Sequence, residues 1–340
     1  MSARACSHLG AGFCYLCAMV TTEVLIIGAG PIGIACALAC KKQQLEYIVL
    51  EKGALTNSLF NYPLNMNFFS TSDKLEIANI PFISKDAKPG RDEALEYYRR
   101  VVTSSNLNIR LFEKVCSVEK EEGRFHITSE KQSYIAQNVI VATGFYDIPK
   151  LLNVPGEDLP KVTHYYKEAH PYVLQKNIVV GASNSSVDAA LEIWRKGGEV
   201  TMIVRGKSIG ERVKYWVKPD IENRIQEGSI SAYFEAEISE IKETEVIITT
   251  PQGTKTIPNN FVIALTGYRP NFEFLERIGI QLSEEKNIPT YNEETMESNV
   301  KGLYLAGVIC GGMETHKWFI ENSRIHAKRI AKHISEKKAS

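Results

Sequence analysis

Short apolar runs and helix-length stretches follow one another along most of this chain. An uncharged run at 24–27 leads into a helix-like stretch at 34–45, and another apolar run at 47–50 comes next. Buried strands joined by helices are typical of a parallel sheet in an α/β protein. The pattern also predicts a helix at 92–104 and strands at 115–120, 124–129 and 138–144, with a polar, aromatic loop at 61–73.

The same succession of strand, turn, helix and strand occurs a second time. A strand at 176–180 enters a turn at 181–186, and a helix at 187–196 and a strand at 200–204 follow. Each copy matches one nucleotide-binding unit. We therefore predict an α/β fold with two Rossmann-like dinucleotide-binding domains.

The first turn has the glycine spacing of a dinucleotide site. Gly28 permits the tight turn, Gly30 lets the backbone approach a pyrophosphate, and Gly33 lets the helix pack closely on the strand. Glu51 ends the second strand, where its carboxylate can accept hydrogen bonds from ribose hydroxyls. The alternative is a glycine-rich turn without a ligand. The predicted contacts of this unit are Gly28, Gly30, Pro31, Ile32, Gly33, Glu51 and Lys52.

The second turn differs in a way that changes the expected nucleotide. Ser183 and Ser186 replace the second and third glycines, and Arg205 stands where the first copy has an acid. A cation at this place suits a 2'-phosphate, which a carboxylate would repel, so we predict NADPH here. The alternative for Arg205 is a surface residue at a strand end. The predicted contacts are Gly181, Ser183, Asn184, Ser185, Ser186 and Arg205.

Strands that end in small residues recur towards the C-terminus, at 261–267 and 302–307. The helix expected at about 314–334 would aim its positive end at a flavin ring. Chain order therefore predicts an NADPH domain at 155–265 inserted into a discontinuous FAD domain at 20–154 and 266–340. Further predicted contacts are Thr143, Gly144, Gly267, Gly307 and Val308.

Composition is that of an ordinary globular protein and excludes some partners. The chain has 44% hydrophobic and 24% charged residues, with 40 basic against 40 acidic side chains. The basic segment 324–338 is interpreted as the solvated face of a last helix, so no nucleic acid is expected. The uncharged stretch 24–40 is interrupted by glycines and a proline, so no membrane span is expected. No residues are assigned to a metal.

The first 19 residues are an unusual leader, with a Cys14-x-x-Cys17 pair. We interpret the leader as an over-long gene start that is not part of the native protein, since Met19 lies just before the first strand. A targeting segment, a short anchor and a redox dithiol are the alternatives.

The order of motifs carries a family resemblance. The two glycine turns, the Ala-Thr-Gly at 142–144, TGYRP and GLYLAG resemble the thioredoxin-reductase-like two-domain flavoproteins over residues 21–335. Within that group, the strings at 61–82, 164–172 and 294–326 resemble the bacillithiol disulfide reductases. This resemblance implies FAD, NADPH, a cytoplasmic homo-oligomer (dimer or tetramer), and reduction of a low-molecular-weight thiol disulfide.

Several positions depart from the related patterns. The span 164–172 lacks the Cys-x-x-Cys of thioredoxin reductases, so thioredoxin is not expected as a substrate. Bacillithiol-type enzymes often have a cysteine in the first glycine turn, where this chain has Ile32. Val308 replaces the aspartate of the wider flavoprotein pattern, a change that the bacillithiol-type enzymes share.

Three residues near the C-terminus are candidate catalytic groups. Cys310 lies just after the last strand and before a helix, a setting that lowers a thiol pKa. His316 and His326 fall in the region expected to approach the flavin, where either could protonate a leaving thiolate. Packing or surface roles are the alternatives for all three. Cys36 and Cys40 are expected to be packing residues, and Cys116 a strand core residue.

We therefore predict an NADPH-dependent FAD oxidoreductase that acts on a small disulfide. A ferredoxin or flavodoxin NADP reductase, which needs no active-site cysteine, is the alternative among enzymes. A redox-sensing protein that holds the nucleotides without turnover is the alternative outside enzymes.

Overall fold

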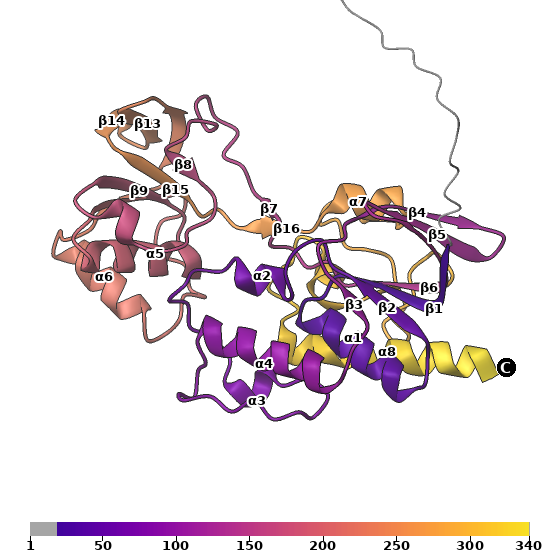
Figure 1. The fold of residues 1–340 in the computed structure, drawn as a ribbon. Helices are drawn as coiled ribbons and strands as arrows, with labels where there is room; N and C mark the ends of the chain where they lie inside the picture. The colour runs from indigo at the N-terminus through magenta and orange to yellow at the C-terminus, as the bar shows by residue number, and fades with distance from the viewer. Residues whose placement is uncertain (1–18, 340) are drawn as a thin grey trace, which may run out of the picture.

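The computed structural model describes residues 19–339. The predicted leader, with Cys14 and Cys17, lies outside the described residues. The chain folds into two lobes, each built on its own sheet (Figure 1).

The larger lobe contains a seven-stranded sheet in the order β3-β2-β1-β6-β5-β4, with β17 paired to β6. β1 runs parallel to β2 and β6, and β17 runs parallel to β6, whereas β5 runs antiparallel to both of its neighbours, β4 and β6. The strands are β1 Val20–Ile27, β2 Tyr47–Leu50, β3 Ile109–Arg110, β4 Val115–Glu121, β5 Arg124–Ser129, β6 Ser133–Val141 and β17 Leu303–Leu305.

Helices α1 and α8 pack against each other beneath this sheet (Figure 1). The helical elements of this lobe are α1 Pro31–Lys42, α2 Asn57–Phe60, α3 Ser72–Leu75, α4 Arg91–Ser104, α7 Phe272–Arg277, α8 Ile320–Ala339 and the 3₁₀ turn η2 Gly307–Gly311.

The smaller lobe contains a five-stranded parallel sheet in the order β11-β10-β9-β15-β8, and a three-stranded antiparallel sheet adjoins it. Its elements are β8 Val162–Thr163, η1 His170–Tyr172, β9 Lys176–Val180, α5 Asn184–Arg195, β10 Glu199–Val204, α6 Lys218–Gln226, β11 Ser231–Phe234, β12 Glu237–Ile241, β13 Glu245–Thr250, β14 Gly253–Pro258 and β15 Phe261–Ala264.

A two-stranded ribbon joins the lobes (Figure 1). β7 Ile148–Pro149 carries the chain out of the larger lobe and pairs antiparallel with β16 Tyr268–Arg269, which carries it back. The five-stranded sheet thus lies, in sequence, between two segments of the seven-stranded sheet. The domain boundaries at 155 and 265 stay predictions.

The central strands are buried on both faces. Val24, Leu25 and Ile26 of β1 are each 0% exposed, and burying each such side chain contributes about 1.5–3 kcal/mol. Parallel strands covered on both faces are apolar throughout, which explains the uninterrupted apolar runs in the sequence. Within residues 19–339, no helix combines the length and the apolar character needed to cross a bilayer.

Two expectations about local structure are wrong. The last helix begins at Ile320 rather than near 314, because the preceding residues form turns in which the Lys317 N–H donates to the Glu314 carbonyl at 2.9 Å. The Asn322 side chain then accepts the Phe319 N–H at 2.7 Å at the start of the helix. Cys116 is exposed rather than in the core. The pairing of β4 with β5 shifts register between Val115 and Ser117, and such a bulge re-aims the side chain that it contains.

Candidate active site

The first cavity, of about 410 Å³, opens at the carboxyl ends of β1, β2 and β6. The three strands end beside the N-terminus of α1, as expected for a ligand site in an open α/β sheet. Among the residues predicted to contact the first nucleotide, two do not line this cavity: Gly33 and Gly267. Its lining includes Gly28, Gly30, Pro31, Ile32, Glu51, Lys52, Thr143, Gly144, Gly307 and Val308.

The glycines of the first turn have different steric roles. A Cβ on Gly33 would lie 1.9 Å from the Gly28 carbonyl oxygen, and a Cβ on Gly28 would lie 2.6 Å from the Ala142 carbonyl oxygen. Both glycines therefore permit close packing of backbone on backbone. At Gly30, by contrast, a Cβ would meet nothing within 4 Å. The backbone at the start of α1 thus faces open space, which fits the phosphates of a dinucleotide.

Backbone groups hold the Glu51 carboxylate at the edge of this cavity. One oxygen accepts the Ala29 N–H at 2.8 Å and the other accepts the Gly53 N–H at 3.0 Å. Burial raises the pKa of Glu51, and these two hydrogen bonds oppose the rise. The carboxylate is oriented before any ligand binds. Lys52 pairs with Asp147 at 2.7 Å, so part of its charge is already neutralised.

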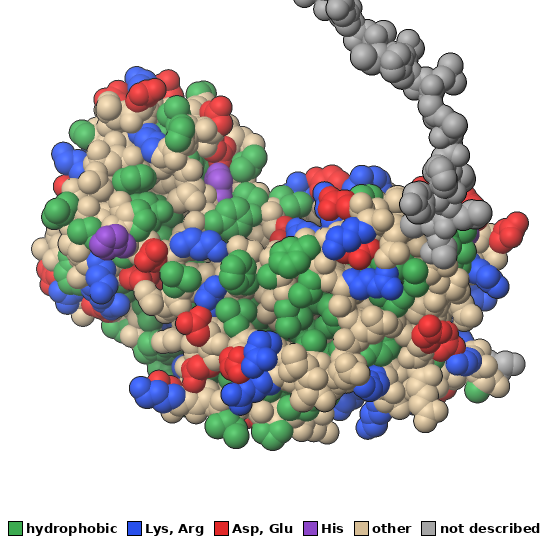
Figure 2. All heavy atoms as spheres, in the orientation of Figure 1, with side chains coloured by type: hydrophobic (Ala, Val, Ile, Leu, Met, Phe, Trp, Pro, Cys, Tyr) green, Lys and Arg blue, Asp and Glu red, His purple; other side chains and the backbone are tan. Residues whose placement is uncertain are grey.

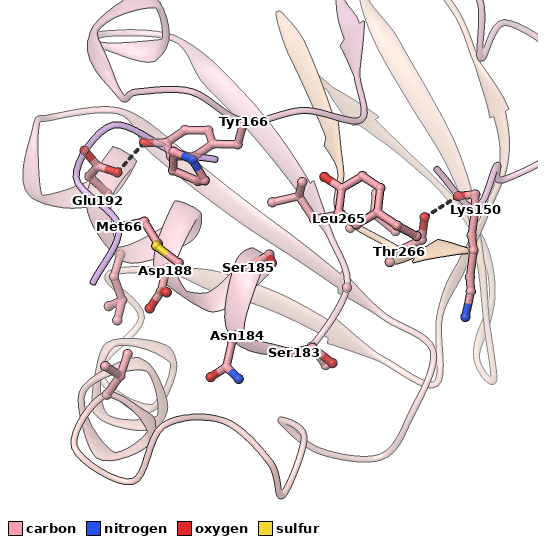
Figure 3. Close-up of a pocket in the computed structure, with 18 of the residues that line it drawn as sticks. Met66, Lys150, Tyr166, Ser183, Asn184, Ser185, Asp188, Glu192, Leu265 and Thr266 are labelled. Carbon is pink, nitrogen blue, oxygen red and sulfur yellow. Dashed lines mark hydrogen bonds between the residues drawn. The ribbon is translucent and has the colours of Figure 1, made fainter. Parts of the chain in front are cut away.

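The second cavity, of about 1460 Å³, lies beside the N-terminus of α5 (Figure 3). Gly181 has a φ of +124°, and a Cβ there would lie 2.7 Å from the Leu265 carbonyl oxygen. The buried Ser186 hydroxyl donates to the Ser183 carbonyl at 2.9 Å, which explains how serine fits in place of the third glycine. Of the predicted contacts, Gly181, Ser183, Asn184, Ser185, Arg205 and Gly267 line this cavity, and Ser186 does not.

The two cavities share a set of lining residues. The loop predicted at 61–73 supplies three of them, and Phe145 and Tyr146 follow Gly144 directly. The Tyr146 ring contacts Tyr62 edge-on, with centroids 4.6 Å apart. Because the cavities adjoin, ligands in both can meet at these side chains. The shared residues are Tyr62, Met66, Phe69, Phe145, Tyr146, Thr315 and Phe319.

Sequence reasoning missed Phe145, Tyr146 and Lys150. The aromatic pair directly after Ala-Thr-Gly was a usable signal, because that strand end was already predicted to touch a cofactor. Lys150 had no such signal, since it follows β7 and enters the second cavity only through the path of the ribbon. In the surface view, hydrophobic side chains gather in the region where the two lobes meet (Figure 2).

The proposed thiol Cys310 is fully buried and lines neither cavity. The expectation of a lowered thiol pKa is wrong, because burial raises the pKa of Cys310 well above its ordinary value. Its Sγ lies 3.9 Å from Nδ1 of His326.

His326 is also buried, and Nδ1 accepts the Gly307 N–H at 3.1 Å. Burial, with the nearby Arg329 charge, lowers the pKa of His326 to about 4, so the ring is neutral at pH 7. His316 is exposed and lines neither cavity. The structure thus brings Cys310 and His326 together behind Gly307 and leaves His316 at the surface. Their catalytic roles stay predictions.

The described cysteines are Cys36, Cys40, Cys116 and Cys310; all are free thiols, and none lines either cavity. Ile32 occupies the place where a cysteine of the first turn would stand. Its side chain packs beside Gly307, since a Cβ built on Gly307 would lie 3.5 Å from Ile32 side-chain carbons. Within residues 19–339, neither cavity therefore offers a protein thiol to an acceptor.

Comparison with known proteins agrees with this architecture. Residues 25–307 match the family described as pyridine nucleotide-disulphide oxidoreductase. Bacilliredoxin reductase Bdr of Bacillus subtilis is 43% identical over 94% of this chain and 99% of its own length. The structure of bacillithiol disulfide reductase Bdr (YpdA) from Bacillus cereus aligns with a TM-score of 0.91 and 41% identity, covering 93% of this chain and 99% of that one. The structure of the same enzyme from Staphylococcus aureus aligns with a TM-score of 0.92 and 40% identity, covering 94% of this chain and 100% of that one.

These matches confirm three predictions: an α/β fold with two dinucleotide-binding domains, an oxidoreductase that uses FAD and NADPH, and the resemblance to bacillithiol disulfide reductases. The chain belongs to the pyridine nucleotide-disulphide oxidoreductase family.

Proposed function

We propose that this protein passes electrons from NADPH through FAD to a low-molecular-weight thiol disulfide such as bacillithiol disulfide. The observation that carries the proposal is the pair of adjoining cavities, each beginning at a glycine turn and both ending at the same aromatic side chains. The names of the relatives, bacilliredoxin reductase and bacillithiol disulfide reductase, support the choice of acceptor.

We assign FAD to the smaller cavity. The open backbone at Gly30 receives the pyrophosphate, and the fixed Glu51 carboxylate accepts a ribose hydroxyl. Thr143, Gly144, Gly307 and Val308 line the rest of this cavity and would contact the remainder of the cofactor, with Ile32 beside Gly307. When bound, FAD supplies two-electron chemistry between NADPH and the acceptor.

We assign NADPH to the larger cavity. The turn from Gly181 to Ser185 would hold the pyrophosphate, and Arg205 at the end of β10 would hold the 2'-phosphate. Tyr62 and Tyr146 line both cavities, so their rings would exclude water from the place where the two nucleotides would meet.

The acceptor disulfide enters the shared part of the cavities itself. No cysteine of residues 19–339 lines either cavity, so that part of the chain provides no thiolate relay between cofactor and acceptor. The neutral His326 ring holds the Gly307 backbone rather than a proton for the acceptor. His316 is exposed and lines neither cavity, so it does not contact an acceptor bound there.

The test is anaerobic stopped-flow reduction of the FAD-loaded protein by NADPH, followed by mixing with bacillithiol disulfide. We expect fast reoxidation of the flavin, with one NADPH consumed for each disulfide reduced. If only oxidised ferredoxin or flavodoxin reoxidised the flavin, the protein would be a ferredoxin or flavodoxin NADP reductase instead. A protein that binds NADPH but does not reduce its flavin would instead be a redox sensor.

We also propose a cytoplasmic location, because the described cysteines are free thiols, as is usual in a reducing compartment. A homo-oligomer, either a dimer or a tetramer, is proposed by analogy with the fold. Light scattering of the FAD-loaded protein distinguishes these states from a monomer.

A further inference from the structure

A second cation shares the NADPH cavity with Arg205. Lys150 follows strand β7 of the ribbon between the lobes, and it lines the same cavity as the α5 turn. Figure 3 shows the Lys150 side chain across the cavity from Ser183 and Asn184.

The backbone on both sides of the Lys150 side chain is fixed. Its N–H donates to the Gly267 carbonyl at 2.9 Å, and its carbonyl accepts the Thr266 hydroxyl. Because these bonds tie β7 to the end of β15, the ammonium is presented from a rigid element.

The two cations lack the partners that would explain them structurally. Among residues 19–339, neither Lys150 nor Arg205 has a carboxylate oxygen within 4.0 Å. Glu237 lines the same cavity but forms no ion pair with either of them. Lys207, the next cation along the chain, pairs with Glu235 instead. The positive charge of Lys150 and Arg205 therefore remains available to a ligand.

Burial and the charge of Arg205 together lower the pKa of Lys150. Two like charges that face one cavity repel each other, and an anion between them removes this repulsion. A phosphate with about two negative charges matches such a pair in charge.

We propose that Lys150 binds the 2'-phosphate of NADPH together with Arg205, and that it is a determinant of the preference for NADPH over NADH. The inference rests on the proposed function, because it assumes that NADPH occupies this cavity. It adds a contact from the inter-lobe ribbon, outside the five-stranded sheet, so part of the nucleotide selectivity is built into the connection between the lobes.

The test uses Lys150→Met, which removes the charge and keeps an unbranched side chain of similar length. Lys150→Arg keeps the charge, and Lys207→Ala is the matched control on a neighbouring cation outside the cavity. Each variant is first checked for FAD content and thermal unfolding. Binding of 2',5'-ADP, 5'-AMP, NADPH and NADH is then measured by anaerobic calorimetry on protein whose FAD has first been reduced, so that no hydride transfer accompanies binding.

Lys150→Met is expected to weaken the binding of 2',5'-ADP and NADPH about tenfold or more, as for loss of a charge-assisted hydrogen bond. The affinities for 5'-AMP and NADH should stay unchanged. Lys150→Arg and Lys207→Ala should retain wild-type affinity. Equal weakening of NADPH and NADH binding would overturn the inference, because it would mean that Lys150 contacts the pyrophosphate, which both nucleotides share. Unchanged NADPH binding would also overturn it. Failure of the wild-type protein to bind NADPH would instead refute the proposed function.

Discussion

One buried histidine, His326, should make the free energy of unfolding depend on pH. Folding lowers the pKa of His326 from 6.5 to about 4, so the unfolded chain takes up its proton first. The free energy of unfolding therefore falls as the pH drops from about 6.5 to about 4, and the contribution of this group is constant below that range. The shift corresponds to about 3 kcal/mol in full, of which about 2 kcal/mol is lost between pH 7 and pH 5.

The variant His326→Gln isolates this contribution. A glutamine side-chain oxygen can still accept the Gly307 N–H, but the side chain does not titrate. His316→Gln is the matched control, because His316 is exposed. Urea unfolding of each FAD-loaded protein at pH 7 and pH 5 gives the free energies.

The decrease from pH 7 to pH 5 should be about 2 kcal/mol smaller in His326→Gln than in the wild type, and unchanged in His316→Gln. Carboxylates also contribute to the decrease, but they are common to all three proteins and cancel in the comparison. An equal decrease in wild type and His326→Gln would refute the reasoning, because it would mean that His326 takes up its proton equally in the folded and unfolded states.

Four further variants test the cavities and the buried thiol behind them. Gly33→Ala places a Cβ 1.9 Å from the Gly28 carbonyl oxygen and should lower the free energy of unfolding by about 3 kcal/mol. Gly30→Ala should instead lower the FAD content, while the free energy of unfolding of the apoprotein changes by less than about 0.5 kcal/mol. Equal effects of the two variants would contradict the distinct roles of the two glycines. Glu51→Gln turns an amide donor towards one of two backbone donors, so FAD affinity should fall about tenfold in fluorescence titrations, and unchanged affinity would exclude a role for the carboxylate. Cys310→Ala should keep the rate of flavin reoxidation by the disulfide within about twofold, because a buried thiol of raised pKa supplies little thiolate, and a large loss in stopped flow would restore Cys310 as a catalytic group.

Local sequence predicted most of the nucleotide framework. The strand at 24–27, the glycine turn and Glu51 all lie between residues 24 and 51, so one short segment contains the steric and hydrogen-bonding groups that one ligand needs. The second copy was recognisable for the same reason, although Ser186 replaced a glycine. The structure adds that the Ser186 hydroxyl bonds within the turn, a local contact that a spacing rule does not contain.

The chemistry near the C-terminus was less predictable. Position after a strand suggested a reactive Cys310, but the side chain points into the core, where desolvation raises its pKa. Burial depends on elements distant in sequence, including the packing of α8 on α1. A pKa inferred from the nearest helix end therefore fails when distant elements close over the group.

The sequence by itself determined the two nucleotide units, the cation at Arg205, and the lack of a cysteine at Ile32, because each depends on residue type and short spacing. Only the tertiary structure decided that the two cavities adjoin at Tyr62 and Tyr146, and that Lys150 shares a cavity with Arg205. The physical reason is that these contacts form where separate lobes meet, and the ribbon that joins the lobes fixes their geometry without leaving a periodic signal in the chain.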